Sequence, residues 1–134
     1  MIRYKKAKAK NKPMLIEYKL LTIIPYTKDD SKKLEIIAYV NNMVSKNYKD
    51  FTIIYHFFKP IRIYLIKDKE LDTLFICEKY RNKGIGSKLM KNIQDKIETI
   101  KVKKENKKAI KFYKQNGFVK EERNKDSLIL RKGD

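Results

Sequence analysis

Two glycines in the middle of the chain have the spacing of an anion-binding turn. An apolar strand pattern ends at Glu78, the segment Tyr80–Gly86 follows, and a helix pattern begins at Ser87. Backbone N–H groups at the start of a helix lack intrahelical acceptors and lie at the positive end of the helix dipole, so they favour an anion. Gly84 and Gly86 have no side chain that would keep a ligand away from the backbone. The segment therefore predicts a phosphate-binding turn.

Other glycine-rich phosphate loops fit this segment less well. The dinucleotide-binding fingerprint needs a third Gly or Ala at the position of Leu89. A P-loop needs Gly-Lys-Ser/Thr, whereas the chain has Gly86-Ser87-Lys88. An ordinary strand-to-helix turn that binds nothing is the remaining alternative.

Two segments together resemble the GNAT superfamily of acetyl-CoA-dependent N-acyltransferases. The first is Arg81-x-x-Gly84-x-Gly86, which is similar to the family signature R/Q-x-x-G-x-G/A at every fixed position. The second is Glu105–Phe118, which resembles the family's other signature: an Asn that opens a helix, an aromatic-Tyr pair, and Gly-Phe. Both stand in family order and spacing within roughly the C-terminal half of the chain.

The resemblance implies that acetyl-CoA is the co-substrate and that no metal takes part. In the family, the strand before the phosphate loop pairs with the pantetheine arm, and a backbone N–H of that strand holds the acetyl oxygen. Carried over by position, the residues expected to contact the cofactor are Leu74, Phe75, Ile76, Arg81, Asn82, Lys83, Gly84, Ile85, Gly86, Ser87, Asn106 and Tyr113.

The same resemblance assigns Tyr113 as the general acid that protonates the departing thiolate. Asn106 and Tyr113 are seven residues apart, so they share one helix face, which we expect to line the cofactor while Phe112 points toward the core. The alternative is that Tyr113 is only a core residue.

The general base is less well defined by the sequence. Glu70 falls where some histone-modifying members of the family carry their catalytic Glu, and Asp72 lies on the same strand face. The subgroup that acetylates protein N-termini has a Glu at the position of Lys101, so its mechanism does not transfer simply. Glu70 as a mere turn residue, and deprotonation through water, both stay open.

We therefore expect an acetyltransferase that moves an acetyl group from acetyl-CoA to a primary amine. The acceptor, which the sequence does not name, is a protein, a small molecule or aminoacyl-tRNA. The rival hypothesis is a non-catalytic module of the same shape that binds nucleic acid or a partner through its basic surface.

The chain has 134 residues and a formal net charge of +18. The electric field of so positive a chain attracts polyanions. However, most of the charge is lysine, which is less suited than arginine to bidentate phosphate recognition. Codon bias in an AT-rich genome would also produce a lysine-rich composition. Single residues of cysteine (Cys77) and histidine (His56) exclude a disulfide framework and a multi-histidine metal site. Cys77 is expected to be a small buried hydrophobe. With a single cysteine, no run of ~20 apolar residues and no secretory h-region, we expect a cytoplasmic protein. We expect it to be a monomer or a homodimer.

The hydrophobic periodicity predicts one domain over residues 1–134 of class α+β, with a central, mostly antiparallel sheet flanked by helices and the order β-α-α-β-β-β-α-β-α-β-β. Residues 1–12 are either a first strand or a basic arm. Pro25 is expected to end the first helix, and the second helix to bury a stripe that includes Leu34, Ile37, Ala38, Val40 and Val44. Lys59-Pro60 and Asp68-Lys69 are expected hairpin turns. The elements are predicted at Ile2–Lys8, Met14–Ile24, 29–47, Phe51–Phe58, Ile61–Lys67, Leu71–Cys77, Ser87–Ile97, Ile100–Val102, Asn106–Asn116, Phe118–Glu122 and Ser127–Arg131.

Overall fold

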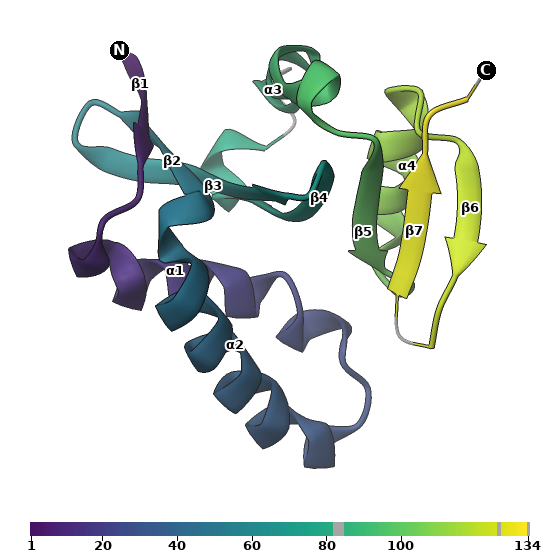
Figure 1. The fold of residues 1–134 in the computed structure, drawn as a ribbon, viewed down its shortest axis with the longest axis horizontal. Coiled ribbons are helices and arrows are strands. Elements are labelled where there is room, and N and C mark those ends of the chain that lie inside the picture. Colours follow the sequence, from purple (N-terminus) through teal and green to yellow (C-terminus); the bar gives the residue numbers. More distant parts are fainter. Residues whose placement is uncertain (82–84, 126, 134) are drawn as a thin grey trace. The chain divides into compact units, whose positions relative to one another are not determined.

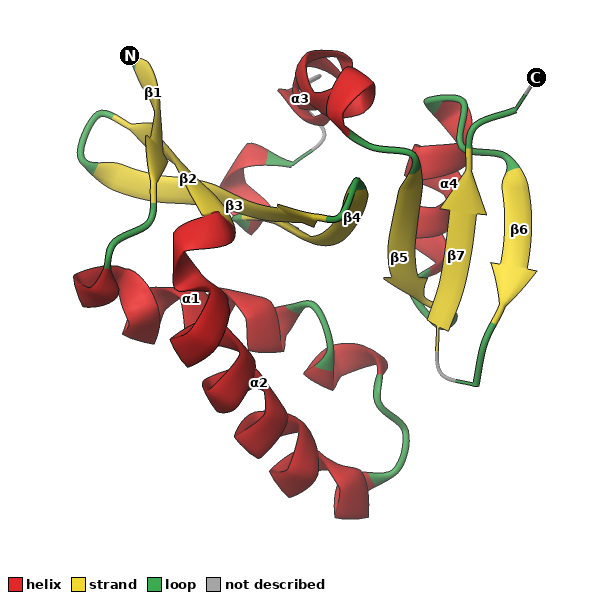
Figure 2. Ribbon diagram, viewed as in Figure 1, coloured by secondary structure: helices red, strands yellow, loops and turns green. Residues whose placement is uncertain are grey.

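The computed structural model describes residues 1–81, 85–125 and 127–133, and its helices and strands follow the predicted order (Figures 1 and 2). The α+β class is confirmed, and short 3₁₀ helices occupy several connections. The main elements are β1 (Ile2–Lys6), α1 (Lys12–Leu21), α2 (Lys33–Asn47), β2 (Phe51–His56), β3 (Lys59–Lys67), β4 (Glu70–Ile76), α3 (Ile85–Ile93), β5 (Thr99–Lys103), α4 (Lys107–Gln115), β6 (Lys120–Arg123) and β7 (Ser127–Arg131).

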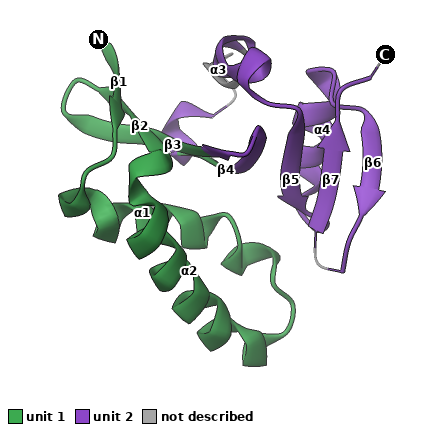
Figure 3. Ribbon diagram, viewed as in Figure 1, with its two compact units in different colours: residues 1–65, 73–76 green, residues 66–72, 77–134 purple. Residues whose placement is uncertain are grey.

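The strands form one seven-stranded sheet in the order β1-β2-β3-β4-β5-β7-β6. The pairing of β4 with β5 is parallel, and β1–β2, β2–β3, β5–β7 and β6–β7 are antiparallel. The chain groups into two compact units (Figure 3): residues 1–65 with 73–76, and residues 66–72 with 77–134. No helix within the described ranges has the length and apolar character needed to cross a membrane.

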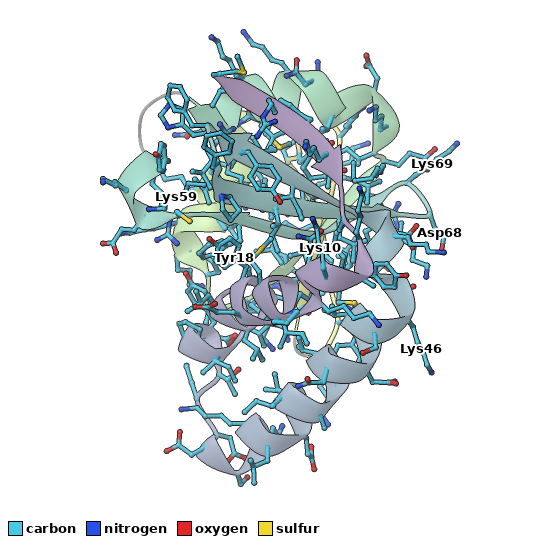
Figure 4. The ribbon with its side chains drawn as sticks, turned by 90° about the vertical axis from the view of Figure 1, so that its left-hand side faces the viewer. Lys10, Tyr18, Lys46, Lys59, Asp68 and Lys69 are labelled. Carbon is cyan, nitrogen blue, oxygen red and sulfur yellow. The ribbon has the colours of Figure 1, made fainter. Side chains whose placement is uncertain are left out.

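The first unit contains the predicted first strand, which is an edge strand of the sheet and pairs with β2 from Ile2↔His56 to Lys6↔Thr52. Ile53 and Ile63 lie opposite each other in β2 and β3 and are fully buried. Leu15 of α1 is also fully buried, and α1 contacts α2. Tyr18 of α1, labelled in Figure 4, donates its hydroxyl to the carbonyl of Pro60 at 2.9 Å.

The β2–β3 turn differs from the prediction. Lys59 and Pro60 are the first residues of β3, where they pair with His56 and Tyr55, and the turn consists of the two phenylalanines before them. Phe57 adopts a φ of 58°, the left-handed conformation that a tight hairpin turn requires. Pro60 is tolerated because it stands at the start of its strand, next to a register shift in β2. The predicted Asp68-Lys69 turn is confirmed, with both φ angles positive.

The apolar stripe predicted for α2 is only partly correct. Val40 and Val44 are fully buried, whereas Leu34, Ile37 and Ala38 are exposed. At 3.6 residues per turn, Leu34 and Ala38 point roughly a third of a turn or more away from Val40, so one helix face cannot bury all of them. The first helix ends at Leu21 rather than at Ile24, because Pro25 has no N–H to donate to the Leu21 carbonyl and its ring disfavours a helical turn there.

The second unit contains the C-terminal strands, with β7 paired to β5 on one side and β6 on the other. The predicted inward residues of the third helix, Leu89, Met90, Ile93 and Ile97, are all buried. The helix itself ends at Ile93, and its predicted last turn is the 3₁₀ helix Gln94–Lys96. Cys77, predicted to be buried, is only half-buried just past the end of β4.

Candidate active site

The predicted anion-binding turn leads directly into α3. A 3₁₀ helix, Glu78–Tyr80, follows β4, and its last turn closes when Arg81 donates its backbone N–H to Glu78 at 3.1 Å. Arg81 is exposed, and so are Lys79 and Lys88 on either side of the turn. The described part of the turn therefore presents three basic side chains to solvent around the start of a helix.

The predicted cofactor residues from Asn82 to Ser87 span the turn and the first turn of α3. Asn82, Lys83 and Gly84 lie outside the described residues. For Ile85, Gly86 and Ser87 the structure describes only the backbone, which forms the first turn of α3. α3 runs for nine residues, so its first N–H groups have no acceptor within the helix. The described backbone is thus consistent with an anion at this helix start.

Asn106 opens α4, as predicted. It is the N-cap residue, and its side-chain oxygen accepts a hydrogen bond from the backbone N–H of Ala109 at 3.2 Å. This bond satisfies one of the donors that the first turn of a helix leaves without a partner. The described role of Asn106 is therefore to fix where α4 begins.

The other end of α4 is a Schellman motif. Phe118 donates its backbone N–H to the carbonyl of Tyr113, and Gly117 donates to Lys114, both at 3.1 Å. Gly117 has a φ of +95°, which confirms its predicted place just beyond the helix end. The motif commonly brings the side chains of the residues at the Tyr113 and Phe118 positions together, and both are buried, with 5% and 1% of their surface exposed.

Tyr113 is therefore buried, whereas Phe112 is only partly buried, the reverse of the expected orientation. Phe118, whose backbone N–H bonds the Tyr113 carbonyl, is buried as well, so the buried face at the end of α4 is the one that carries Tyr113. Burial in an apolar setting raises the pKa of the Tyr113 phenol. Tyr113 thus holds its proton across the physiological pH range, and no described residue forms a hydrogen bond with its hydroxyl.

Glu70 is the first residue of β4 and not part of the turn. It pairs with Thr99 in the parallel ladder, and the Thr99 hydroxyl donates to its carboxylate Oε1 at 3.0 Å. The neighbouring Lys69 forms its ion pair with Glu98, at 3.5 Å, so it does not neutralise Glu70. The Glu70 side chain is half-buried and held by β5. No local pattern in the sequence pointed to this contact between Thr99 and Glu70.

The strand residues expected to contact pantetheine belong to the first unit. Leu74, Phe75 and Ile76 form the last part of β4, and Phe75 is buried with its ring 4.6 Å from that of Tyr18. The ladder between β4 and β5 comprises the pairs Glu70↔Thr99 and Leu71↔Ile100, so β4 continues beyond it to Ile76.

A buried lysine in the first unit was not anticipated. Lys19 of α1 is only 5% exposed, and its Nζ donates to the hydroxyl of Thr73 in β4. The signal was present in the spacing, since Lys19 stands four residues after the buried Leu15 and therefore on the same helix face. Among the described residues, no group of three or more metal-ligating side chains is assembled.

Comparison with known proteins links this arrangement to one family. A family model for the acetyltransferase (GNAT) domain matches residues 36–120, more than half of the chain. Among curated protein sequences, none matches.

Solved structures share the fold over nearly the whole chain. Apo-form YjaB from Escherichia coli has 19% sequence identity and a TM-score of 0.72, over 97% of this chain and 95% of that one. A PaiA N-acetyltransferase from Thermoplasma acidophilum, solved with coenzyme A, has 20% identity and a TM-score of 0.68, over 99% of both chains. Naa50 from Arabidopsis thaliana, solved with the bisubstrate analogue CoA-Ac-MVNAL, has 20% identity and a TM-score of 0.63, over 99% of both chains.

Proposed function

Because this chain belongs to the GNAT family of acetyltransferases, we propose that it moves an acetyl group from acetyl-CoA to a primary amine. The observation that carries the proposal is the family match over residues 36–120, which contains β4, the basic turn and α4 with both of its caps. Acetyl-CoA supplies an activated thioester carbonyl. The protein must bind the cofactor, stabilise the developing oxyanion and move two protons.

The cofactor pyrophosphate is assigned to the turn that precedes α3. The exposed Arg81, with the backbone N–H groups at the start of α3, provides positive charge and hydrogen-bond donors for it. Asn82, Lys83 and Gly84 would complete this site, and Leu74, Phe75 and Ile76 would align the pantetheine arm along β4. Asn106 contributes by fixing the start of α4, the helix that carries Tyr113.

Tyr113 is assigned as the general acid. Its raised pKa means that the phenol is protonated and ready to donate, but it also makes the phenol a weaker acid than in water. A thiolate that forms in the same apolar surroundings is also destabilised by desolvation, and this restores the drive for proton transfer. Burial thus disfavours both the phenolate of Tyr113 and the thiolate of CoA.

Glu70 is assigned as the general base that receives the amine proton, directly or through water. Its Oε1 is engaged by the Thr99 hydroxyl, which leaves the other carboxylate oxygen for a proton acceptor role. The hydrogen bond from Thr99 restricts the side chain to one orientation, as a catalytic carboxylate requires.

Acetyl-CoA binding is the first test of this function. Isothermal titration of the intact chain should show saturable binding. Arg81→Gln should weaken it, while Arg123→Gln should not, because Arg123 is an exposed residue at the end of β6. Both variants lower the net charge equally, so the comparison separates a local contact from the overall field. Gly84→Val should also abolish binding, since a branched side chain blocks the approach of phosphate to the backbone.

Transfer itself is tested by release of free CoA with a panel of amines: peptides with a free amino terminus, polyamines and aminoacyl-RNA. Amine-dependent release supports the enzyme. Saturable binding without release for any acceptor would favour the non-catalytic module, and the absence of binding would refute the cofactor assignment.

A further inference from the structure

Exposed aromatic side chains gather at one end of the β1–β2–β3 part of the sheet. The β2–β3 turn consists of Phe57 and Phe58, which expose 58% and 89% of their surface. Turns of this kind are normally made of Gly, Asn or Asp, and Phe57 holds a positive φ that a bulky residue disfavours. Neither side chain belongs to the buried core, so core packing does not account for two phenylalanines at this position.

Arg3 lies close to two aromatic rings and bonds the backbone of the turn. Its guanidinium carbon lies 5.8 Å from the ring centroid of Phe58 and 6.0 Å from that of Tyr55. One of its terminal nitrogens also donates to the carbonyl of Phe57 at 3.0 Å. A guanidinium placed among aromatic rings offers flat surfaces for stacking together with a charge that pairs with phosphate. We call the set Arg3, Tyr55, Phe57, Phe58 and Lys59 the hairpin platform.

The charge around the hairpin platform is of one sign. Residues 1–16 and 51–67, which contain β1, β2 and β3, include nine Lys and Arg residues and no Asp or Glu. Within the described ranges, no carboxylate forms an ion pair with Arg3, Lys5, Lys6 or Lys59. The positive field at this end of the first unit is therefore not neutralised locally, and it favours a polyanion.

We propose that the hairpin platform binds single-stranded nucleic acid. Bases stack on the exposed rings, above all Phe58, and phosphates contact Arg3 and Lys59. A second copy of the chain fits this surface less well, because it would bring two uncompensated basic surfaces together. Lys5 and Lys6 on the edge strand β1 also oppose pairing with another strand. The proposal is independent of acetyl transfer, since no residue of the platform is among those assigned to the cofactor or to catalysis.

The stacking contribution is tested by fluorescence anisotropy with labelled oligouridylate and oligothymidylate. Phe58→Ala should weaken binding of either oligonucleotide about tenfold, the loss expected for one base–aromatic stack. Leu34→Ala is the matched control, because Leu34 is 79% exposed on α2 but lies outside the platform. It should bind as well as the unmodified chain. Equal affinity of Phe58→Ala and the unmodified chain would overturn the proposal.

The phosphate contact is tested by salt dependence. Lys59→Gln should reduce the slope of log affinity against log salt by about 0.7, the value for one phosphate contact to a single strand. Lys46→Gln on α2 removes the same charge, and Figure 4 shows Lys46 well apart from Lys59. Lys46→Gln should leave the slope unchanged. Identical slopes for the two variants would mean that only the net charge attracts the nucleic acid, which would refute the platform.

Competition and light scattering test the other occupants of this surface. Polyglutamate carries charge without bases, so it should displace the oligonucleotide poorly. Displacement as effective as that by unlabelled oligouridylate would overturn the stacking contribution. A dimer that Phe58→Ala dissociates would show that a second copy occupies the platform instead. Acetyl-CoA binding should be unchanged in Phe58→Ala and Lys59→Gln, which keeps these outcomes separate from those of acetyl transfer.

Discussion

Replacement of Tyr113 by Phe separates the catalytic and the structural roles of this residue. Tyr113 is only 5% exposed, and among the described residues its hydroxyl has no hydrogen-bond partner. Its removal therefore takes away a desolvated polar group and keeps the ring, so the free energy of unfolding should change by less than about 1 kcal/mol. Tyr113→Ala removes the ring as well and should cost about 3–5 kcal/mol. Chemical denaturation of both variants measures this difference.

The same Tyr113→Phe variant should lose turnover. If the phenol protonates the thiolate, kcat should fall by about 10²–10⁴, the usual contribution of a positioned acid. Acetyl-CoA affinity should stay within about twofold, since the ring is retained. Tyr64→Phe is the matched control, because Tyr64 is also a buried tyrosine but lies in β3 of the first unit. The assay is release of free CoA with the best acceptor of the panel.

Two results would refute the reasoning on Tyr113. Near-normal turnover of Tyr113→Phe, with chemistry as the slow step, would assign the proton transfer to another group or to water. Loss of acetyl-CoA binding would make the hydroxyl a cofactor contact. The pH profile gives an independent check: the raised pKa of Tyr113 predicts that its own titration lies above ~10, so no alkaline loss of activity near neutrality should come from this residue.

Three further predictions concern α4 and its surroundings. Gly117→Ala should destabilise the fold by about 1–2 kcal/mol in chemical denaturation, because a Cβ there meets no atom within 4 Å and the cost comes from the positive φ alone. Asn106→Ala should cost about 1 kcal/mol by loss of the cap to Ala109, and Asn106→Asp should restore most of it; no loss in Asn106→Ala would contradict the capping role. The hydrogen bond and charge of Lys114 lower the pKa of Glu121 in the folded protein. The pair therefore stabilises the fold at pH values above the unfolded-state pKa of ~4.3. This stabilisation is lost as the pH falls through the lowered pKa of the folded state. The unmodified chain should therefore be more stable than Glu121→Gln at neutral pH, and the two stabilities should converge at acidic pH. A difference that stays constant with pH would refute the linkage.

Local sequence signals were sufficient for much of the fold and of the candidate site. The N-cap of α4 at Asn106 and its end at Gly117 were predictable because caps depend on a few neighbouring residues. The inward residues of α3 followed from helical spacing. The element order and the α+β class were predictable because apolar residues repeat every two positions in the strands and every three to four positions in the helices.

The tertiary structure decided what the local patterns left open. Burial of Lys19 depends on the Thr73 hydroxyl of β4, 54 residues away, which accepts its hydrogen bond. The Thr99 hydroxyl meets Glu70 only because β4 and β5 pair in parallel. Periodicity and caps depend on interactions within a few residues, whereas both of these contacts join residues that only the folded chain brings together. The sequence alone therefore determined the elements but not these contacts.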